Sequence, residues 1–448
     1  MPSRPTTVTT CPARPSASRR PGRRRRRVGA VLAATLAAAA CGGGGDDEPA
    51  AGADVELITA GVERAAPSPS APVNEVVTGI DAFGLRAERM LAAEGGGNTV
   101  LSPTSIAVAF AMVSAAADDA TAERIAEVFG FPGAPDVHEA MNSLTATLAS
   151  ANQTDPDRGD VVLDVANSLW AQSGYEIGQE FLDSLAAQYG AGLSTADFES
   201  DPDGGRRAIN ASVAESTRDR IADLMPEGSV TEDTRAVVVN AVYLKAPWDT
   251  DFAEDATAPQ AFHLADGTTV DVPMMHGSLH GVRAAVTDAY TAAELPYLGD
   301  ELAMLVVVPN GSASLDDVLA GLGDGGLGAV AAGLGAAAVD VTLPRWHSGT
   351  AADLAALLTE LGLRIPGGAL PGIAPDLEIT AAVHAADITV DEAGTEAAAA
   401  TAVGIGVTSA PAPGEIVELV ADRPYLFAVR HVETGAPLFV GRVADPRG

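Results

Sequence analysis

The chain offers few residues whose types and spacing could support catalysis or metal binding. His276 and His280 are four residues apart, a spacing that would place two metal ligands on one face of a helix. Pro273 and Gly277 disfavour a helix here, and no acidic residue is placed as a third ligand. The sequence contains no serine-hydrolase elbow, Walker loop, HExxH or CxxC motif. We therefore expect neither an enzyme nor a bound metal or cofactor.

A segment near the C-terminus has the pattern of a loop that could change its conformation. Residues 391–409 read DEAGTEAAAATAVGIGVTS, and residues 397–414 carry no charge. In a strand, alternate residues share a face. One face would hold small and β-branched residues: Thr395, Ala397, Ala399, Thr401, Val403, Ile405 and Val407. Glu396 falls on the other face, and the glycines and prolines of residues 404–414 disfavour a permanent strand. We interpret the segment as a loop that can become a strand. The alternative is a short Ala-rich helix over residues 395–402, followed by a flexible turn.

The N-terminus resembles an export signal. Seven arginines lie in residues 19–27, an uncharged Ala-rich run follows over 28–40, and Cys41 comes directly after small residues. This order resembles a bacterial lipobox, so we expect a lipoprotein-type signal peptide over 1–40 and lipidation of Cys41. The protein would then be exported and anchored at the outer face of the cytoplasmic membrane or at the cell surface. The alternative is simple secretion. Residues 41–72 are rich in Gly, Ala and Pro, and we expect a disordered tether there.

Composition and pattern describe the remaining chain, residues 73–448. The chain has 448 residues, 47% of them apolar, and a formal net charge of −33. Such an acidic surface disfavours the binding of nucleic acid and of heparin-type polyanions. Helical patterns dominate residues 76–150, and strand patterns dominate from residue 236, with a terminal hairpin over 426–443. Helices first and strands later indicate an α+β fold. The two cysteines, Cys11 and Cys41, lie outside this part, which excludes a disulfide framework from it.

Several sequence motifs, taken in order, resemble those of the serpins, the serine-protease-inhibitor family. The hinge-like DEAGTEAAAATA of residues 391–402 is preceded by LSPTSI at 101–106, VVNAVYLKAPW at 238–248 and VPMMH at 272–276. LPYLGDELAMLVVVPN at 295–310 and VTLPRW at 341–346 also fit, as does DRPYLFAVRHVETGAPLFVGRVADP at 422–446. The resemblance runs from about residue 73 to residue 446.

The resemblance implies a single large domain in which helices pack around three β-sheets and a reactive-centre loop, residues 392–414, is exposed. It implies a suicide substrate for a serine protease, or for a cysteine protease. The protease cuts the loop and forms an acyl-enzyme, and the loop then inserts into the central sheet and traps the protease in a covalent complex. A monomer that needs no polyanion is expected.

The resemblance also implies roles for individual residues. The hinge consists of Glu392, Gly394, Thr395, Glu396, Ala397, Ala398, Ala399, Ala400 and Thr401. Family spacing places the scissile bond at Thr408–Ser409, with the bonds at 407–408 and 409–410 as alternatives. None of these bonds presents Arg, Lys or an aromatic residue, so we expect a protease of the elastase or subtilisin type.

Five further positions correspond to structural controls of sheet opening: Ser102, Ser105, Asn240, Trp248 and His384. Each of them could equally be an ordinary core residue or a helix cap. The competing function is a non-inhibitory serpin that acts as a carrier, chaperone or decoy substrate. An inhibitor forms an SDS-stable complex with its protease, whereas a mere substrate is only cut.

Overall fold

The computed structural model describes residues 55–95, 97–395 and 416–448, which belong to one compact unit. The predicted signal peptide, Cys41, the hinge residues from Glu396 onward and the Thr408–Ser409 bond lie outside the described residues. Within the described residues, no helix is both long enough and apolar enough to cross a membrane.

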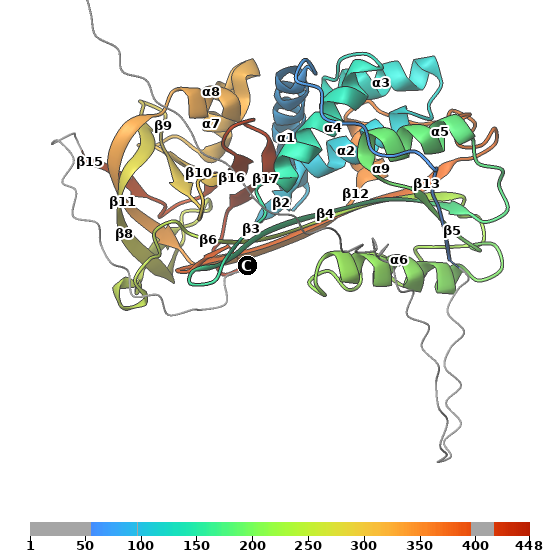
Figure 1. Cartoon of the computed structure of the whole chain (residues 1–448). Coiled ribbons are helices and arrows are strands. Elements are labelled where there is room, and N and C mark those ends of the chain that lie inside the picture. The colour runs from blue at the N-terminus through green and yellow to red at the C-terminus, as the bar shows by residue number, and fades with distance from the viewer. Residues whose placement is uncertain (1–54, 96, 396–415) are drawn as a thin grey trace, which may run out of the picture. The chain divides into compact units, whose positions relative to one another are not determined.

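A central sheet crosses the unit (Figure 1). Its strand order is β1 (Glu56–Ile58), β5 (Leu193–Ala196), β4 (Gly159–Gln172), β6 (Ala236–Pro247), β14 (Gly394–Thr395), β13 (Ile379–Asp391) and β12 (Trp346–Asp353), and β3 (Gln153–Asp155) pairs with β4. β6 is buried on both faces, because Val238, Val242 and Leu244 join one apolar cluster while Val237 and Val239 join another. A strand covered on both sides reads as a continuous apolar run, as VVVNAVYL does.

The second sheet has the order β15 (Ile416–Val420), β11 (Gly335–Pro344), β8 (Thr269–Val286), β9 (Tyr290–Pro296), β10 (Leu302–Pro309), β16 (Tyr425–His431), β17 (Pro437–Val443) and β2 (Thr99–Leu101), and β7 (Ala258–His263) pairs with β8. The predicted hairpin over residues 426–443 is present as β16 and β17. Three sheets were expected, whereas the described strands form two hydrogen-bonded sheets. The reason is β8, an 18-residue strand that pairs with β7 and β11 along most of its length and with β9 at its end.

Helices cover both faces of the central sheet. Figure 1 shows α1 (Val73–Gly95), α2 (Pro103–Ser114), α3 (Asp119–Phe129), α4 (Asp136–Ala149), α5 (Gln179–Ser184) and α9 (Leu354–Glu360) on one side, and α6 (Pro202–Ser216) on the other. A π-helical turn, Leu185–Tyr189, extends α5. α7 (Leu315–Gly321) and α8 (Gly326–Ala332) pack against β10 and β16 of the second sheet. Ser102 caps α2, since its side chain accepts the N–H of Ser105.

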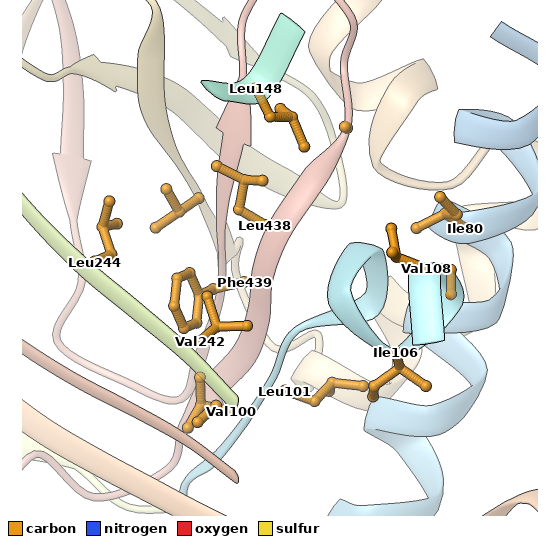
Figure 2. Close-up of a cluster of buried hydrophobic side chains, with 14 of the residues drawn as sticks. Ile80, Val100, Leu101, Ile106, Val108, Leu148, Val242, Leu244, Leu438 and Phe439 are labelled. Atoms are coloured by element: carbon orange, nitrogen blue, oxygen red, sulfur yellow. The ribbon is translucent and has the colours of Figure 1, made fainter. Parts of the chain in front are cut away.

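The largest apolar cluster lies where α2 meets both sheets. Figure 2 shows side chains of this cluster, with Ile106 and Val108 from α2, Val242 from β6 and Phe439 from β17. All four side chains are at most 6% exposed. Close packing of this kind fixes α2 against β6, which places Ser102 and Ser105 on the face of the central sheet that α2 covers.

Residues 55–72 differ from the disordered tether that we expected over 41–72. Glu56–Ile58 forms β1, which pairs antiparallel with β5 at the edge of the central sheet. Further along, Arg64 Nε donates to Asn142 Oδ1 of α4 at 2.8 Å, and Ser68 N donates to Ser143 Oγ at 3.0 Å. Composition did not reveal this because the apolar residues of this stretch, such as Leu57 and Ile58, are few and flanked by Gly, Ala and Pro. An open sheet edge supplies the missing partner.

Candidate functional site

The candidate site is the junction between β6 and β13. Over residues 236–242 and 379–386 the two strands pair directly and run parallel. Beyond that stretch β14 lies between them, with Gly394 opposite Pro247 and Asp391, and Thr395 opposite Ala246 and Val390. β14 runs antiparallel to both neighbours. The junction is therefore closed along one part and already holds two residues of a third strand at its end.

Local chemistry explains the sharp turn from β13 into β14. Asp391 Oδ1 accepts the backbone N–H of Ala393 at 2.9 Å and that of Gly394 at 3.3 Å, which reverses the chain. Gly394 has φ 147°, and a β-carbon on it would lie 2.2 Å from the carbonyl oxygen of Ala246. Only glycine can take this conformation at this distance from β6. Gly394 is thus required for the hinge to enter the junction.

Thr395 is held by an aromatic pair. Its side chain is 1% exposed, and its Oγ1 lies 2.6 Å from the hydroxyl oxygen of Tyr297. The Tyr297 ring stacks on Trp248, with ring centroids 4.5 Å apart. Trp248 Nε1 donates to Asp391 O at 2.9 Å, and the Trp248 backbone N–H donates to Ala393 O at 3.0 Å. Trp248 therefore contacts the hinge turn directly, at the end where β14 enters.

An ion pair fixes Glu392, the first residue of the turn between β13 and β14. Glu392 is 7% exposed at its side chain, and its carboxylate accepts from Arg345 Nε at 2.7 and 2.6 Å and from the hydroxyl of Thr257. Burial alone would raise the pKa of Glu392, but the hydrogen bonds from Arg345 and Thr257 hold that pKa below its usual value. The carboxylate is therefore charged and firmly bound at neutral pH.

A buried polar cluster closes the junction further along. Ser102 N–H donates to His384 Nε2 at 3.1 Å, so His384 Nδ1 carries the proton and donates to Asn240 Oδ1 at 2.5 Å. Asn240 Nδ2 donates to Ser105 Oγ at 2.5 Å, and Ser105 Oγ donates to Asn167 Oδ1 at 2.9 Å. Burial lowers the pKa of His384 to about 3, which keeps the imidazole neutral. The cluster thus ties β6 to β13 through neutral hydrogen bonds.

The structure brings four of the five predicted control residues together and places the fifth elsewhere. Ser102, Ser105, Asn240 and His384 form one cluster, whereas Trp248 lies at the hinge. Of the predicted hinge, Glu392, Gly394 and Thr395 are described, and all three are buried. His276 and His280 lie on β8, and within the described ranges no three His, Cys, Asp or Glu side chains are grouped as a metal site.

Four residues of this site were not identified from the sequence: Tyr297, Arg345, Thr257 and Asn167. A signal for Asn167 was present, because it interrupts the alternating apolar series of Val161, Leu163, Val165 and Leu169. Arg345 directly precedes Trp346 in VTLPRW, but its distance of 47 residues from Glu392 gave no indication of a pair. Tyr297 and Thr257 carry no local signal.

Comparisons with known proteins agree on one family. Residues 78–446 match the family model of the serpins, described as serine protease inhibitors. The leukocyte elastase inhibitor of Sus scrofa is 33% identical over 371 residues, which cover 78% of this chain and 93% of that protein. A serpin-like protein of Thermococcus kodakarensis is 32% identical, covering 83% of this chain and 86% of that protein.

Solved structures show the same fold. The thermophilic serpin tengpin in its native state has a TM-score of 0.74 at 21% identity, covering 87% of this chain and 97% of its own. The Arabidopsis serpin AtSerpin1, in its native stressed conformation, has a TM-score of 0.71 at 26% identity, covering 84% of this chain and 99% of its own. With the family model matched over most of its length, this chain belongs to the serpin family.

Proposed function

We propose that this protein inhibits serine proteases as a suicide substrate whose cut loop inserts between β6 and β13. The observation that carries the proposal is β14. Gly394 and Thr395 already occupy the junction as a strand that is antiparallel to both neighbours. Relatives named as inhibitors support it, among them the leukocyte elastase inhibitor of Sus scrofa and the antithrombin-III of Mus musculus.

The register of β14 gives the course of the inserting strand. Each further loop residue would meet the preceding residue of β6 and of β13. Six residues beyond Thr395, Thr401 would come opposite Asn240, which is six before Ala246, and opposite His384, which is six before Val390. Insertion would therefore separate Asn240 from His384 and offer a threonine hydroxyl in place of their mutual hydrogen bond.

The same register assigns the loop side chains to the two faces of the sheet. Thr395 shares a face with Ala246 and Val390, which belong to the main apolar cluster. Alternate residues from Thr395 to Val407 would follow it onto this face, and all of them are small or β-branched. Glu396 would lie on the other face, opposite Lys245. A charge on the inner face would cost several kcal/mol of desolvation, so the small residues permit rapid insertion.

The chemistry needs only the protease and the loop. The protease serine adds to the carbonyl carbon of Thr408, the peptide bond to Ser409 breaks, and the amine of Ser409 leaves with a proton from the protease histidine. The new ester holds the protease on the loop. Insertion turns one parallel pairing into two antiparallel ladders, which are somewhat more stable per residue and supply the driving force. The protease moves with the loop before water can hydrolyse the ester.

The target would be a protease with a small or shallow pocket. Thr408 and its neighbours offer no cation and no aromatic ring, so an elastase-like or subtilisin-like protease fits better than a trypsin-like one.

Incubation with elastase, subtilisin and trypsin, followed by denaturing gels and mass spectrometry, tests the proposal. We expect an SDS-stable complex with a protease of the first two kinds and a released fragment that begins at Ser409. Cleavage without any stable complex would instead support the non-inhibitory alternative. Cutting only at an arginine outside residues 407–410 would refute the proposed pocket preference.

We also propose that the protein acts as a monomer at the membrane surface, anchored through a lipid on Cys41. The sequence of the signal supports this localisation. Partitioning into detergent that is lost in Cys41→Ser, with the soluble variant still forming the protease complex, is the expected result. Equal partitioning of both proteins would contradict lipidation.

A further inference from the structure

The hairpin formed by β3 and β4 lies beside the hinge, although the proposed mechanism gives it no role. Gln153 pairs with Val161, and Asp155 pairs with Gly159. Asp155 Oδ1 accepts the backbone N–H of Asp157 at 2.9 Å and that of Arg158 at 3.0 Å. These bonds fix the turn and hold the Arg158 backbone in place.

Arg158 contacts the chain corner that follows β6, residues 247–249. Its Nη2 donates to the carbonyl oxygen of Trp248 at 3.0 Å and also to the carbonyl oxygen of Asp249. Its Nη1 lies 3.3 Å from Asp249 Oδ1. A guanidinium can donate to several acceptors at once in a fixed geometry, which a lysine cannot do. Arg158 therefore binds the corner whose Trp248 also carries the hinge turn.

Gln153 reaches the second sheet from the other end of the hairpin. Its Nε2 donates to the carbonyl oxygen of Leu298 at 2.7 Å. The next residue, Gly299, has φ 88°, and a β-carbon on it would lie only 1.8 Å from Gln153 Nε2. The close approach of Gln153 thus depends on a glycine at 299. Leu298 follows Tyr297, the residue that holds Thr395.

These contacts span the joint that must yield when a strand inserts. β4 pairs with β6 from Val162 to Ala171, so the two strands would move together away from β13. The corner after β6 is bonded to the second sheet, because Asp249 N–H donates to Pro296 O at 2.9 Å and Leu298 N–H donates to Pro247 O at 2.8 Å. The hairpin at the start of β4 adds bonds to both sides of this joint, at the end where β14 enters.

We infer that Gln153 and Arg158 are positioning residues that latch the hinge end of the central sheet in the intact protein and set the rate of strand insertion. The inference rests on the proposed function. The latch acts through Trp248 and Leu298, to which these two side chains donate. Its loss would speed insertion while leaving the inserted form as stable as before.

The test measures the rate at which a synthetic peptide with the sequence of residues 395–408 anneals to the full mature protein, followed on native gels. We expect Gln153→Ala to anneal about fivefold faster than wild type, the effect of roughly one ordinary hydrogen bond, and Arg158→Ala to anneal at least as fast as Gln153→Ala because Arg158 makes more than one bond. Arg158→Lys should resemble Arg158→Ala because it loses the forked geometry. Arg124→Ala, which removes an exposed ion pair with Glu127, is the matched control and should anneal at the wild-type rate.

A second readout separates a latch from a merely structural contact. The melting temperatures of the loop-cleaved forms of all variants should equal that of cleaved wild type. Equal losses in the intact and cleaved forms, or annealing of both alanine variants at the wild-type rate, would overturn the latch while the proposed function stands. If no peptide anneals to wild type and nicking does not raise its melting temperature, the proposed function fails and the latch fails with it.

Discussion

The two parts of the β6–β13 junction differ in how they are closed. Where the strands pair directly, Asn240 and His384 join a buried network of neutral hydrogen bonds. Where β14 separates them, Thr395 fills the space and the aromatic pair of Trp248 and Tyr297 supports it. Under the proposed mechanism, the neutral hydrogen bonds of the closed part would be exchanged for those of the inserting loop. Thr395, which is small and buried, would be followed into the junction by the rest of the loop. The closed part and the entry end of one junction are therefore held by different chemistry.

The largest effect should come from blocking insertion of the loop at Thr395. Thr395→Arg places a charge between β6 and β13 at a position 1% exposed, at a desolvation cost of several kcal/mol. We expect the protease complex to form about a thousandfold more slowly, while the loop is still cleaved. Inhibition kinetics would measure the rate of complex formation, and denaturing gels would show the cleavage. Glu396→Gln, on the outer face by register, is the control and should inhibit nearly as wild type does. Equal loss in both variants would contradict the assignment of faces.

The next largest effect should come from the ion pair between Glu392 and Arg345. Glu392→Lys places a cation against Arg345 in a mostly buried site. We expect the intact form to lose about 3 kcal/mol of unfolding free energy. The loss should be smaller than for a fully buried pair because Arg345 is partly exposed. Chemical denaturation would measure the loss. The charge-swapped double variant Glu392→Lys/Arg345→Glu should recover much of the stability. No recovery would show that the effect does not depend on this pair.

A smaller effect should appear in the closed part as a pH dependence. Burial lowers the pKa of His384 to about 3, whereas a histidine in the unfolded chain titrates near 6.5. The unfolded chain binds the proton first, so stability is complete above about pH 6.5 and falls as pH drops toward 3. Between pH 7 and pH 5 we expect His384 to account for a loss of about 2 kcal/mol. Denaturation curves of His384→Gln should lack this part of the loss, and an identical pH slope in the variant would contradict it.

The smallest effect concerns only the inserted state. Register places Glu396 opposite Lys245, and such cross-strand ion pairs contribute roughly 0.5 kcal/mol. Lys245→Ala should therefore lower the melting temperature of the loop-cleaved form slightly and leave the intact form unchanged. If the melting temperature of the intact form alone changed, Lys245 would have a partner other than Glu396.

Local pattern was enough to predict much of the fold. The helical pattern over residues 76–150 corresponds to α1, α2, α3 and α4, and the hairpin expected over residues 426–443 is β16 and β17. Composition failed for residues 55–72, because an open edge of β5 determines whether β1 forms.

The site was predicted less completely, because its contacts join distant parts of the chain. The resemblance supplied Ser102, Ser105, Asn240 and His384, and the structure shows that they share one network. Tyr297 lies 98 residues from Thr395, so no local pattern connects them. The roles of the loop residues from Glu396 to Ser409 stay predictions.

We propose that the intact chain is held short of its most stable arrangement until one bond in the loop is cut. Calorimetry of the wild-type protein before and after a single cut within residues 407–410, confirmed by mass spectrometry, tests it most directly. We expect the nicked protein to melt well above the intact one. A nicked protein that melts at the same temperature or lower would contradict it.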